Sequence, residues 1–192
     1  YATGSYNSFV GSKAGRGGQT SAPYSSGQNN TAIGYKALYG FTTSGENIAI
    51  GYDSLGDNTT ASNTISIGNN ALASQTTGGN VYNVAIGNYA MQYLTLGVGS
   101  NGSNTAIGMF SMRGSSGNSD QAQFNTAVGR DTLGAITGGG YNTAMGVYAG
   151  RYITTGNLNV FIGTEAGEAI TTQDKCILIG HQAGTVINSD DA

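Results

Sequence analysis

The sequence predicts an all-β protein, a parallel β-solenoid (β-roll) of about ten coils that forms one repeat domain over residues 1–192. Three observations predict it: a pentapeptide that recurs ten times, a basal spacing of about 17 residues between copies, and extra residues that always fall in the same sector of the repeat. One such repeat holds two short strands and two turns, and the abundant Asn, Thr and Gly disfavour helix.

The composition describes a polar, weakly charged chain. Of its 192 residues 33 are glycine, only 9% are charged, and the net charge is −3. Disorder normally comes with high net charge, and the single cysteine excludes an internal disulfide framework. No apolar run approaches the roughly 18 residues of a membrane span, and the seven Lys and Arg are scattered along the sequence. We therefore expect neither membrane insertion nor nucleic-acid binding.

The pentapeptide consists of Asn, a β-branched residue, a small residue, a large aliphatic residue and Gly, as in NTAIG at Asn30–Gly34. The longer repeats differ from the basal ones by a few extra residues, which always precede the next Asn. Such insertions are loops on one side of a solenoid. The coils centre on Gly11, Gly34, Gly51, Gly68, Gly87, Gly108, Gly129, Gly146, Gly163 and Gly180.

Side chains in a strand alternate between two faces. We expect the aliphatic residue before Gly, and the residue two positions earlier, to face the interior of the roll. The small residue between them then faces outwards, although it is apolar, and a strand that is apolar on both faces is buried on both. Either alanine merely suits a tight strand, or this column is an oligomer interface made of Phe9, Ala32, Ala49, Ala85, Ala106, Ala127, Ala144, Phe161 and Leu178.

The first position of the pentapeptide predicts a structural ladder. Stacked amides can hydrogen-bond from coil to coil, and Asn tolerates the left-handed conformation that a corner requires. The closing glycine predicts a second corner with positive φ or a close backbone approach. The ladder residues are Asn7, Asn30, Asn47, Asn83, Asn104, Asn125, Asn142 and Asn159, and Thr64 and Cys176 replace Asn in the other two coils.

The second half of each coil carries its own pattern. Four residues after the closing glycine stands Leu or Met in six coils and Gly in the other four. In the last three coils an Ile follows three residues later, at Ile153, Ile170 and Ile187. We expect one large side chain per coil to fill the same core slot from either position. Thr, Ser, Gly and Asn then turn the chain back to the next pentapeptide.

The NTAIG-xx-AL repeat resembles arrays in bacteriophage tail fibres and is similar to the head repeats of trimeric autotransporter adhesins, whose N-S-x-A-I-G coils form a left-handed β-roll trimer. The resemblance covers about residues 6–187. It implies a homotrimeric, extracellular or virion fibre segment that mediates attachment to a cell surface, of phage or bacterial origin. The family's heptad stalk, membrane-anchoring barrel and self-cleaving chaperone domain are not recognisable, and the start at Tyr1 suggests a fragment or a processed chain.

The residues with reactive side chains predict neither an enzyme nor a cofactor or metal site. His181, the only histidine, stands at a variable position, and one histidine without partners predicts a surface residue. Cys176 lies in an apolar strand, which predicts a buried, inert thiol. Asp53 with Asp57 lacks the spacing of a calcium loop, and Asp190 with Asp191 predicts a solvated tail.

The two variable positions that follow each closing glycine are candidates for binding a partner. Five aromatic side chains there predict an exposed line that contacts cell-surface glycan: Tyr35, Tyr52, Tyr89, Phe110 and Tyr148. They can equally cover the rod surface or pack in an oligomer groove. The longer inserts, Arg16–Asn29, Leu94–Ser103 and Arg113–Gln123, are competing receptor loops.

Two further functions stay open as alternatives to a trimeric fibre. One is a self-assembling extracellular filament, since the ends of a solenoid are open strand edges. The other is ice binding, which a regular outward Thr array would favour. The sequence disfavours it, because valine and isoleucine interrupt the Thr column, which we place inside.

Overall fold

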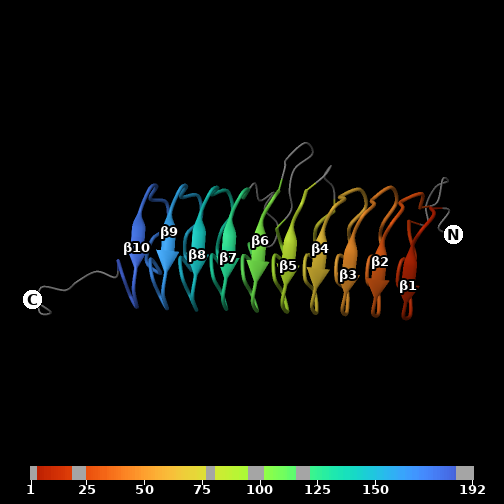
Figure 1. Ribbon diagram of the computed structural model, residues 1–192, viewed down its shortest axis with the longest axis horizontal. Helices are drawn as coiled ribbons and strands as arrows, with labels where there is room; N and C mark the ends of the chain where they lie inside the picture. The colour runs from red at the N-terminus through yellow and green to blue at the C-terminus, as the bar shows by residue number, and fades with distance from the viewer. Residues whose placement is uncertain (1–3, 19–24, 77–80, 95–101, 116–121, 185–192) are drawn as a thin grey trace, which may run out of the picture.

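Ten short strands stack along one axis to form a rod (Figure 1), seen here in a computed structural model that describes residues 4–18, 25–76, 81–94, 102–115 and 122–184. Each strand has three residues. They are β1 (Ser8–Val10), β2 (Thr31–Ile33), β3 (Ile48–Ile50), β4 (Ile65–Ile67), β5 (Val84–Ile86), β6 (Thr105–Ile107), β7 (Thr126–Val128), β8 (Thr143–Met145), β9 (Val160–Ile162) and β10 (Ile177–Ile179). No helix among the described residues is long and apolar enough to cross a membrane.

The strands form a single parallel sheet whose order follows the sequence from β1 to β10. Equivalent residues of neighbouring coils are paired, so Ala32 lies beside Ala49, and Ala49 beside Ser66. Each column of the repeat is therefore a physical row along the rod. The predicted parallel β-solenoid, with its regular spacing of coils, is confirmed.

The predicted assignment of the two strand faces is wrong. The middle residue of each strand points into the roll: Ala32, Ala49, Ala85, Ala106, Ala127, Ala144 and Phe161 have no exposed surface, and Phe9 and Leu178 are partly buried against the same core. The flanking Thr, Ile, Val and Met side chains point outwards. The reason is the width of the roll, since its interior has room for a small strand residue facing one large side chain from the opposite wall. The column that we expected to be an oligomer interface lies inside its own chain.

The large core side chain comes from the turn segment in six coils and from the strand in three others. Leu38, Leu55, Leu72, Met91, Met112 and Leu133 are fully buried. In three of the four coils where glycine replaces them, the strand supplies the large side chain: Phe9, Phe161 and Leu178. A Cβ on Gly167 would collide with Cδ1 of Phe161, and one on Gly150 would lie 2.6 Å from Cδ2 of the same ring. The ring of Phe161 therefore occupies space in two coils, which is why Gly150 accompanies Ala144.

The isoleucines of the last coils do not fill this slot. Ile153 belongs to a separate buried column, seven residues after the closing glycine, in which Phe41, Leu94 and Ile136 are also fully buried. Ile170 packs on the edge of the same core, and Ile187 lies outside the described residues. The prediction that one core slot can be filled from either of two positions is confirmed for the glycine coils. The second position, however, is the middle strand residue and not the isoleucine.

The closing glycines allow the coils to stack closely. Gly34 has a φ of +132°, and a Cβ on it would lie 2.5 Å from the carbonyl oxygen of Gly51 in the next coil. No side chain fits at such a distance, and the positive φ strains any L-residue. Both features expected of this corner are present together.

Each coil also holds non-glycine residues in the left-handed conformation. In the third coil they are Glu46, Asp53 and Leu55, with φ of 61°, 53° and 52°. Their amides donate to carbonyls of neighbouring coils, for example Asp53 to Tyr35 over 2.9 Å, and these bonds offset a strain of about 1–2 kcal/mol per residue. The ladder asparagines are not among them. The corner residue is the one before the ladder position, contrary to our expectation.

A buried amide ladder runs along the inside of the roll. Asn142 donates from its Nδ2 to Oδ1 of Asn125 at 3.0 Å and to the carbonyl of Gly156 at 2.8 Å. Its own Oδ1 accepts the backbone N–H and the Nδ2 of Asn159, both at 3.0 Å. The same pattern joins Asn30 to Asn7 and Asn47 to Asn30. At the two substituted positions the neighbouring amide oxygen still accepts the backbone N–H of Thr64 and Cys176.

The shared core slot predicts strong coupling between Phe161 and Gly167. Phe161→Ala should lower the free energy of unfolding by about 3–5 kcal/mol, because it empties the slot. Gly167→Leu should also destabilise the fold, because the new side chain meets the ring. The double variant recreates the Ala/Leu arrangement of Ala49 and Leu55, so a double-mutant cycle by chemical denaturation should give a favourable coupling of about 1–3 kcal/mol. Additive losses would contradict the shared slot.

The ladder predicts that Asn142→Ala destabilises the roll by about 2–4 kcal/mol, because the carbonyl of Gly156 and the amide groups of Asn159 lose buried partners. The matched control is Thr143→Ala, one residue along and facing outwards, which should cost about 0.5 kcal/mol or less. Denaturant titration of the two variants measures the difference. Equal losses would mean that the ladder contributes nothing beyond its backbone bonds.

Candidate interaction surface

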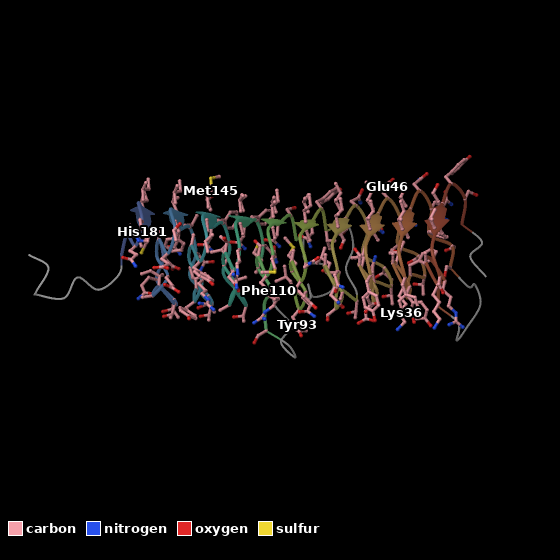
Figure 2. The ribbon with its side chains drawn as sticks, turned by 90° about the horizontal axis from the view of Figure 1, so that it is seen from below. Lys36, Glu46, Tyr93, Phe110, Met145 and His181 are labelled. Carbon is pink, nitrogen blue, oxygen red and sulfur yellow. The ribbon has the colours of Figure 1, made fainter. Side chains whose placement is uncertain are left out.

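The outward face of the sheet carries an aliphatic column along its whole length. The aliphatic residue before each closing glycine reaches solvent, with Ile33 40%, Ile107 38% and Met145 50% exposed. The residue two positions earlier points the same way, and it is Thr or a β-branched aliphatic in every strand except β1, where it is Ser8. Figure 2 shows Met145 on this side of the sheet and Lys36 on the opposite side of the roll.

A third column joins this face, at the position before the ladder asparagine. Tyr82, Phe124, Tyr141 and Leu158 are 40–59% exposed there, and the rings of Phe124 and Tyr141 stack with centroids 4.9 Å apart. Glu46 occupies the column in the third coil and points to the same side as Met145 (Figure 2). The column is polar in the second to fourth coils and apolar in the seventh to ninth.

Our reading of the sequence missed this third column. Its signal is present, because strand alternation places the residue before Asn on the same face as the two residues flanking the central alanine. Aromatic residues at that position in four coils, Tyr6, Tyr82, Phe124 and Tyr141, would have identified it.

The three columns together define what we call the sheet surface. Ten strands at about 4.8 Å each, and four residue steps of about 3.3 Å between the outermost columns, give a face roughly 48 Å long and 13 Å wide, or about 600 Å². The largest apolar patch of an ordinary monomer covers about 300–600 Å² and is often functional. A partner in a standard protein interface contributes about 800 Å². Two such faces together would bury about 1,200 Å², which is the lower end of the range for specific protein interfaces.

The five aromatic residues predicted to form one line lie in two columns. Tyr35 and Tyr52 directly follow closing glycines and stack with centroids 5.4 Å apart. Tyr89 and Phe110 stand one residue later and stack at 5.2 Å. Tyr148 shares their column, and the guanidinium of Arg151 lies 4.5 Å from its centroid. Because stacking on a sugar needs an open ring face, these contacts leave each pair only its outer faces.

The turn segments after the closing glycines hold six of the chain's seven Lys and Arg. Each of the six lies over an aromatic ring, at 4.5 Å from the centroid for the nearest and 5.8 Å for the farthest. They form two groups: Lys13, Arg16 and Lys36 in the first two coils, and Arg113, Arg130 and Arg151 in the sixth to eighth. In the second group Arg130 pairs with Asp131 at 3.4 Å and Arg151 with Glu168 at 3.6 Å. Folding thus gathers cations that are scattered along the sequence.

Two shallow hollows on the described part of the chain are lined mainly by polar groups. One, of about 480 Å³, is lined by Asn29, Glu46, Asn63 and Tyr82 among others and borders the third column of the sheet surface. The other, of about 450 Å³, lies beside Arg113, Asp131, Arg151 and Tyr152.

One carboxyl group of the turn segments has a shifted pKa. Burial away from water and the nearby Asp53 raise the pKa of Asp57, while Lys36 opposes the shift.

The other candidate residues are not brought together. His181 is exposed, as predicted. Cys176 was expected to be buried but is only half-buried, with its Sγ 3.7 Å from the carbonyl oxygen of Asp174. Among the described residues no group of His, Cys, Asp and Glu could hold a metal ion. The predicted receptor loops lie partly outside the described residues, and Asp190 and Asp191 lie wholly outside them.

The chain matches no family model, no curated protein and no solved structure.

The stacked rings predict that Tyr89 and Phe110 stabilise the roll itself. A double-mutant cycle with Tyr89→Ala and Phe110→Ala should give a coupling of about 0.5–1.5 kcal/mol in the free energy of unfolding. The control cycle uses Tyr52 and Tyr148, which lie in different columns several coils apart and should not couple. Absence of coupling between Tyr89 and Phe110 would mean that the two rings do not stabilise the roll through their contact and are both available to bind a ligand.

Proposed function

We propose that this chain is a non-enzymatic structural segment of an extracellular or virion fibre that mediates attachment to a cell surface. In this proposal the segment is a homotrimer in which the sheet surfaces of three copies meet at a common axis. Its partners are its own copies and a cell-surface glycan or protein receptor.

One observation carries the proposal: an outward face with an aliphatic column over every strand, which the described residues do not cover. Burial of apolar area contributes about 25 cal/mol per Å² before the entropic cost of association, so covering these faces favours assembly. The faces are also nearly free of charge, since Glu46 and Lys175 are the only charged residues in the three columns among the described coils. The interface that the proposal needs is thus the face opposite to the alanine column.

The repeat supports the choice of a trimeric fibre over other assemblies. The NTAIG-xx-AL pattern resembles bacteriophage tail-fibre arrays and the heads of trimeric adhesins, in which such rolls associate in threes. A rod of stacked coils suits a spacer or display segment, because every coil supports its neighbours. A self-assembling filament remains the alternative if copies join end to end.

Ice binding is a second candidate, because the Thr column faces outwards and not inwards as we expected. Thr105, Thr126 and Thr143 occupy equivalent outward positions in three successive strands. Aliphatic residues fill the column on both sides of this run, so the Thr array is short. Thermal hysteresis in a monomeric preparation would favour this candidate over the fibre.

The proposal predicts that the particle in solution has the mass of three chains, each of 19.4 kDa. The triple variant Ile33→Glu, Ile107→Glu, Met145→Glu should run as a monomer, because buried carboxylates would meet at the axis. These side chains are exposed in the single roll, so the variant should keep the β-rich circular dichroism spectrum. Light scattering after size exclusion gives both masses.

A matched control places three glutamates in the turn segments that follow the closing glycines, at Tyr35, Tyr52 and Val147, and should leave the mass unchanged. A wild-type monomer would contradict the proposal. Open-ended polymers that persist in the triple variant would favour the end-to-end filament.

A further inference from the structure

The larger of the two hollows lies along the third column of the sheet surface, in the second to fifth coils. The column residues Asn29, Glu46, Asn63 and Tyr82 line it, and its volume of about 480 Å³ is within the range of small-molecule sites, about 300–1,000 Å³. Its other lining residues precede the column in the sequence, so the hollow extends away from the strands. Contact between copies along the two strand columns therefore leaves it accessible. We call it the polar hollow.

The side chains along the polar hollow offer polar groups that are not engaged. No hydrogen bond or ion pair joins the carboxylate of Glu46 or the carboxamides of Asn29 and Asn63 to another described residue. Their main chain, in contrast, is fixed between coils: the N–H of Glu46 donates to the carbonyl of Gln28 at 2.9 Å, and that of Asn63 to the carbonyl of Gly45 at 3.1 Å. A ligand would consequently meet held side chains.

Tyr82 adds an open aromatic face at one end of the polar hollow. Its side chain is 54% exposed, and no other ring of the described residues stacks on it. Tyr35 and Tyr89 differ in that each carries a second ring on one face, and Tyr148 carries the guanidinium of Arg151. A tyrosine presents a large apolar face with a polar tip, which matches a sugar ring with C–H groups on its face and hydroxyls at its rim.

We propose that the polar hollow binds a neutral saccharide, a short oligosaccharide without carboxylate, sulfate or phosphate groups. One sugar ring stacks on Tyr82, while hydroxyls of the ligand donate to the carboxylate of Glu46 and bond the carboxamides of Asn29 and Asn63, which both donate and accept. The four column residues span about 14 Å at the backbone, about the length of a short oligosaccharide. This inference names the receptor class of the proposed attachment function and rests on it for its biological meaning.

The lining favours a neutral saccharide over other ligands. It contains one carboxylate and no Lys or Arg, so an anionic ligand would meet repulsion without compensation. An extended peptide binds through main-chain bonds to an open sheet edge, whereas the carbonyls of Gln28 and Gly45 are already paired. In the part of the chain that the structure describes, no group of His, Cys, Asp and Glu could hold a metal ion.

The second hollow, of nearly equal volume, provides a matched comparison. Its carboxylate and its tyrosine ring are both engaged, since Asp131 pairs with Arg130 at 3.4 Å and the guanidinium of Arg151 lies 5.1 Å from the centroid of Tyr152. We therefore expect it not to bind the same ligand.

The experiment screens the full chain on an array of neutral oligosaccharides built from glucose, galactose, mannose, rhamnose or N-acetylglucosamine, with sialylated and sulfated oligosaccharides beside them. The strongest neutral probe is then titrated in solution and followed by ligand-observed NMR. At least one neutral saccharide should bind, and more strongly than the acidic ones. Failure of every neutral saccharide to bind, or stronger binding of the acidic ones, would overturn the proposal.

The variant Glu46→Gln with Tyr82→Ala should weaken binding of that probe by about tenfold or more, because it removes the charged acceptor and the ring. Tyr82→Phe, which keeps the ring face, should retain binding. The matched control, Asp131→Asn with Tyr152→Ala, makes the same kinds of change in the second hollow and should alter the affinity less than about twofold. Glu46 and Tyr82 are exposed, so the circular dichroism spectrum should not change. Equal losses in the two double variants would contradict the assignment of the site.

Light scattering of the same variants separates this proposal from the proposed fibre. Loss of saccharide binding with an unchanged mass supports the polar hollow whatever the assembly. A trimer that binds no neutral saccharide would overturn the polar hollow alone, and a monomer that still binds would overturn the fibre assembly alone.

Discussion

The narrow cross-section of the roll is the constraint on which the remaining features depend. Each coil has room for one large side chain opposite a small one, because two walls only a few residues wide face each other. The core therefore consists of rows, with alanine on the strand wall and Leu or Met on the turn wall, or a phenylalanine or leucine on the strand facing glycine. The buried amide ladder and the glycine corner occupy the remaining edges of the same cross-section.

This constraint also accounts for the apolar outside. A strand in such a roll can bury only its middle residue, and in the central pentapeptides that residue is alanine or serine. The β-branched and aliphatic residues on either side, which favour strand geometry, consequently point to solvent. The sheet surface is thus a necessary product of the repeat once its largest residues stand beside an alanine.

The sequence predicts the architecture well and the faces badly, for physical reasons. Regular spacing of the closing glycines determines coil number, parallel pairing and register, since equivalent residues must stack. Alternation, however, only separates residues into two sets, and hydrophobicity assigned the larger residues to the inside. Volume was the better guide: with Leu38 or Leu55 already in the core, an isoleucine on the strand wall would not fit. The closing glycines place Lys13 and Lys36 at equivalent positions of neighbouring coils, but their grouping with Arg16 over the rings of Tyr35 and Tyr39 depends on side-chain directions that the repeat does not specify.

The ring of Phe161 has a consequence for how rods of different length could arise. The second to seventh coils each supply their own core side chain. A duplication or loss of one of them would therefore leave neighbouring coils with the same kind of core contact. The eighth coil differs, because it contains both Ala144 and Gly150, and the space beside Gly150 is taken by the ring of Phe161 from the ninth coil and by Cδ2 of Leu133 from the seventh. The eighth coil would have to be inherited together with its two neighbours, which makes this region a natural boundary in any lineage that changes rod length by whole coils.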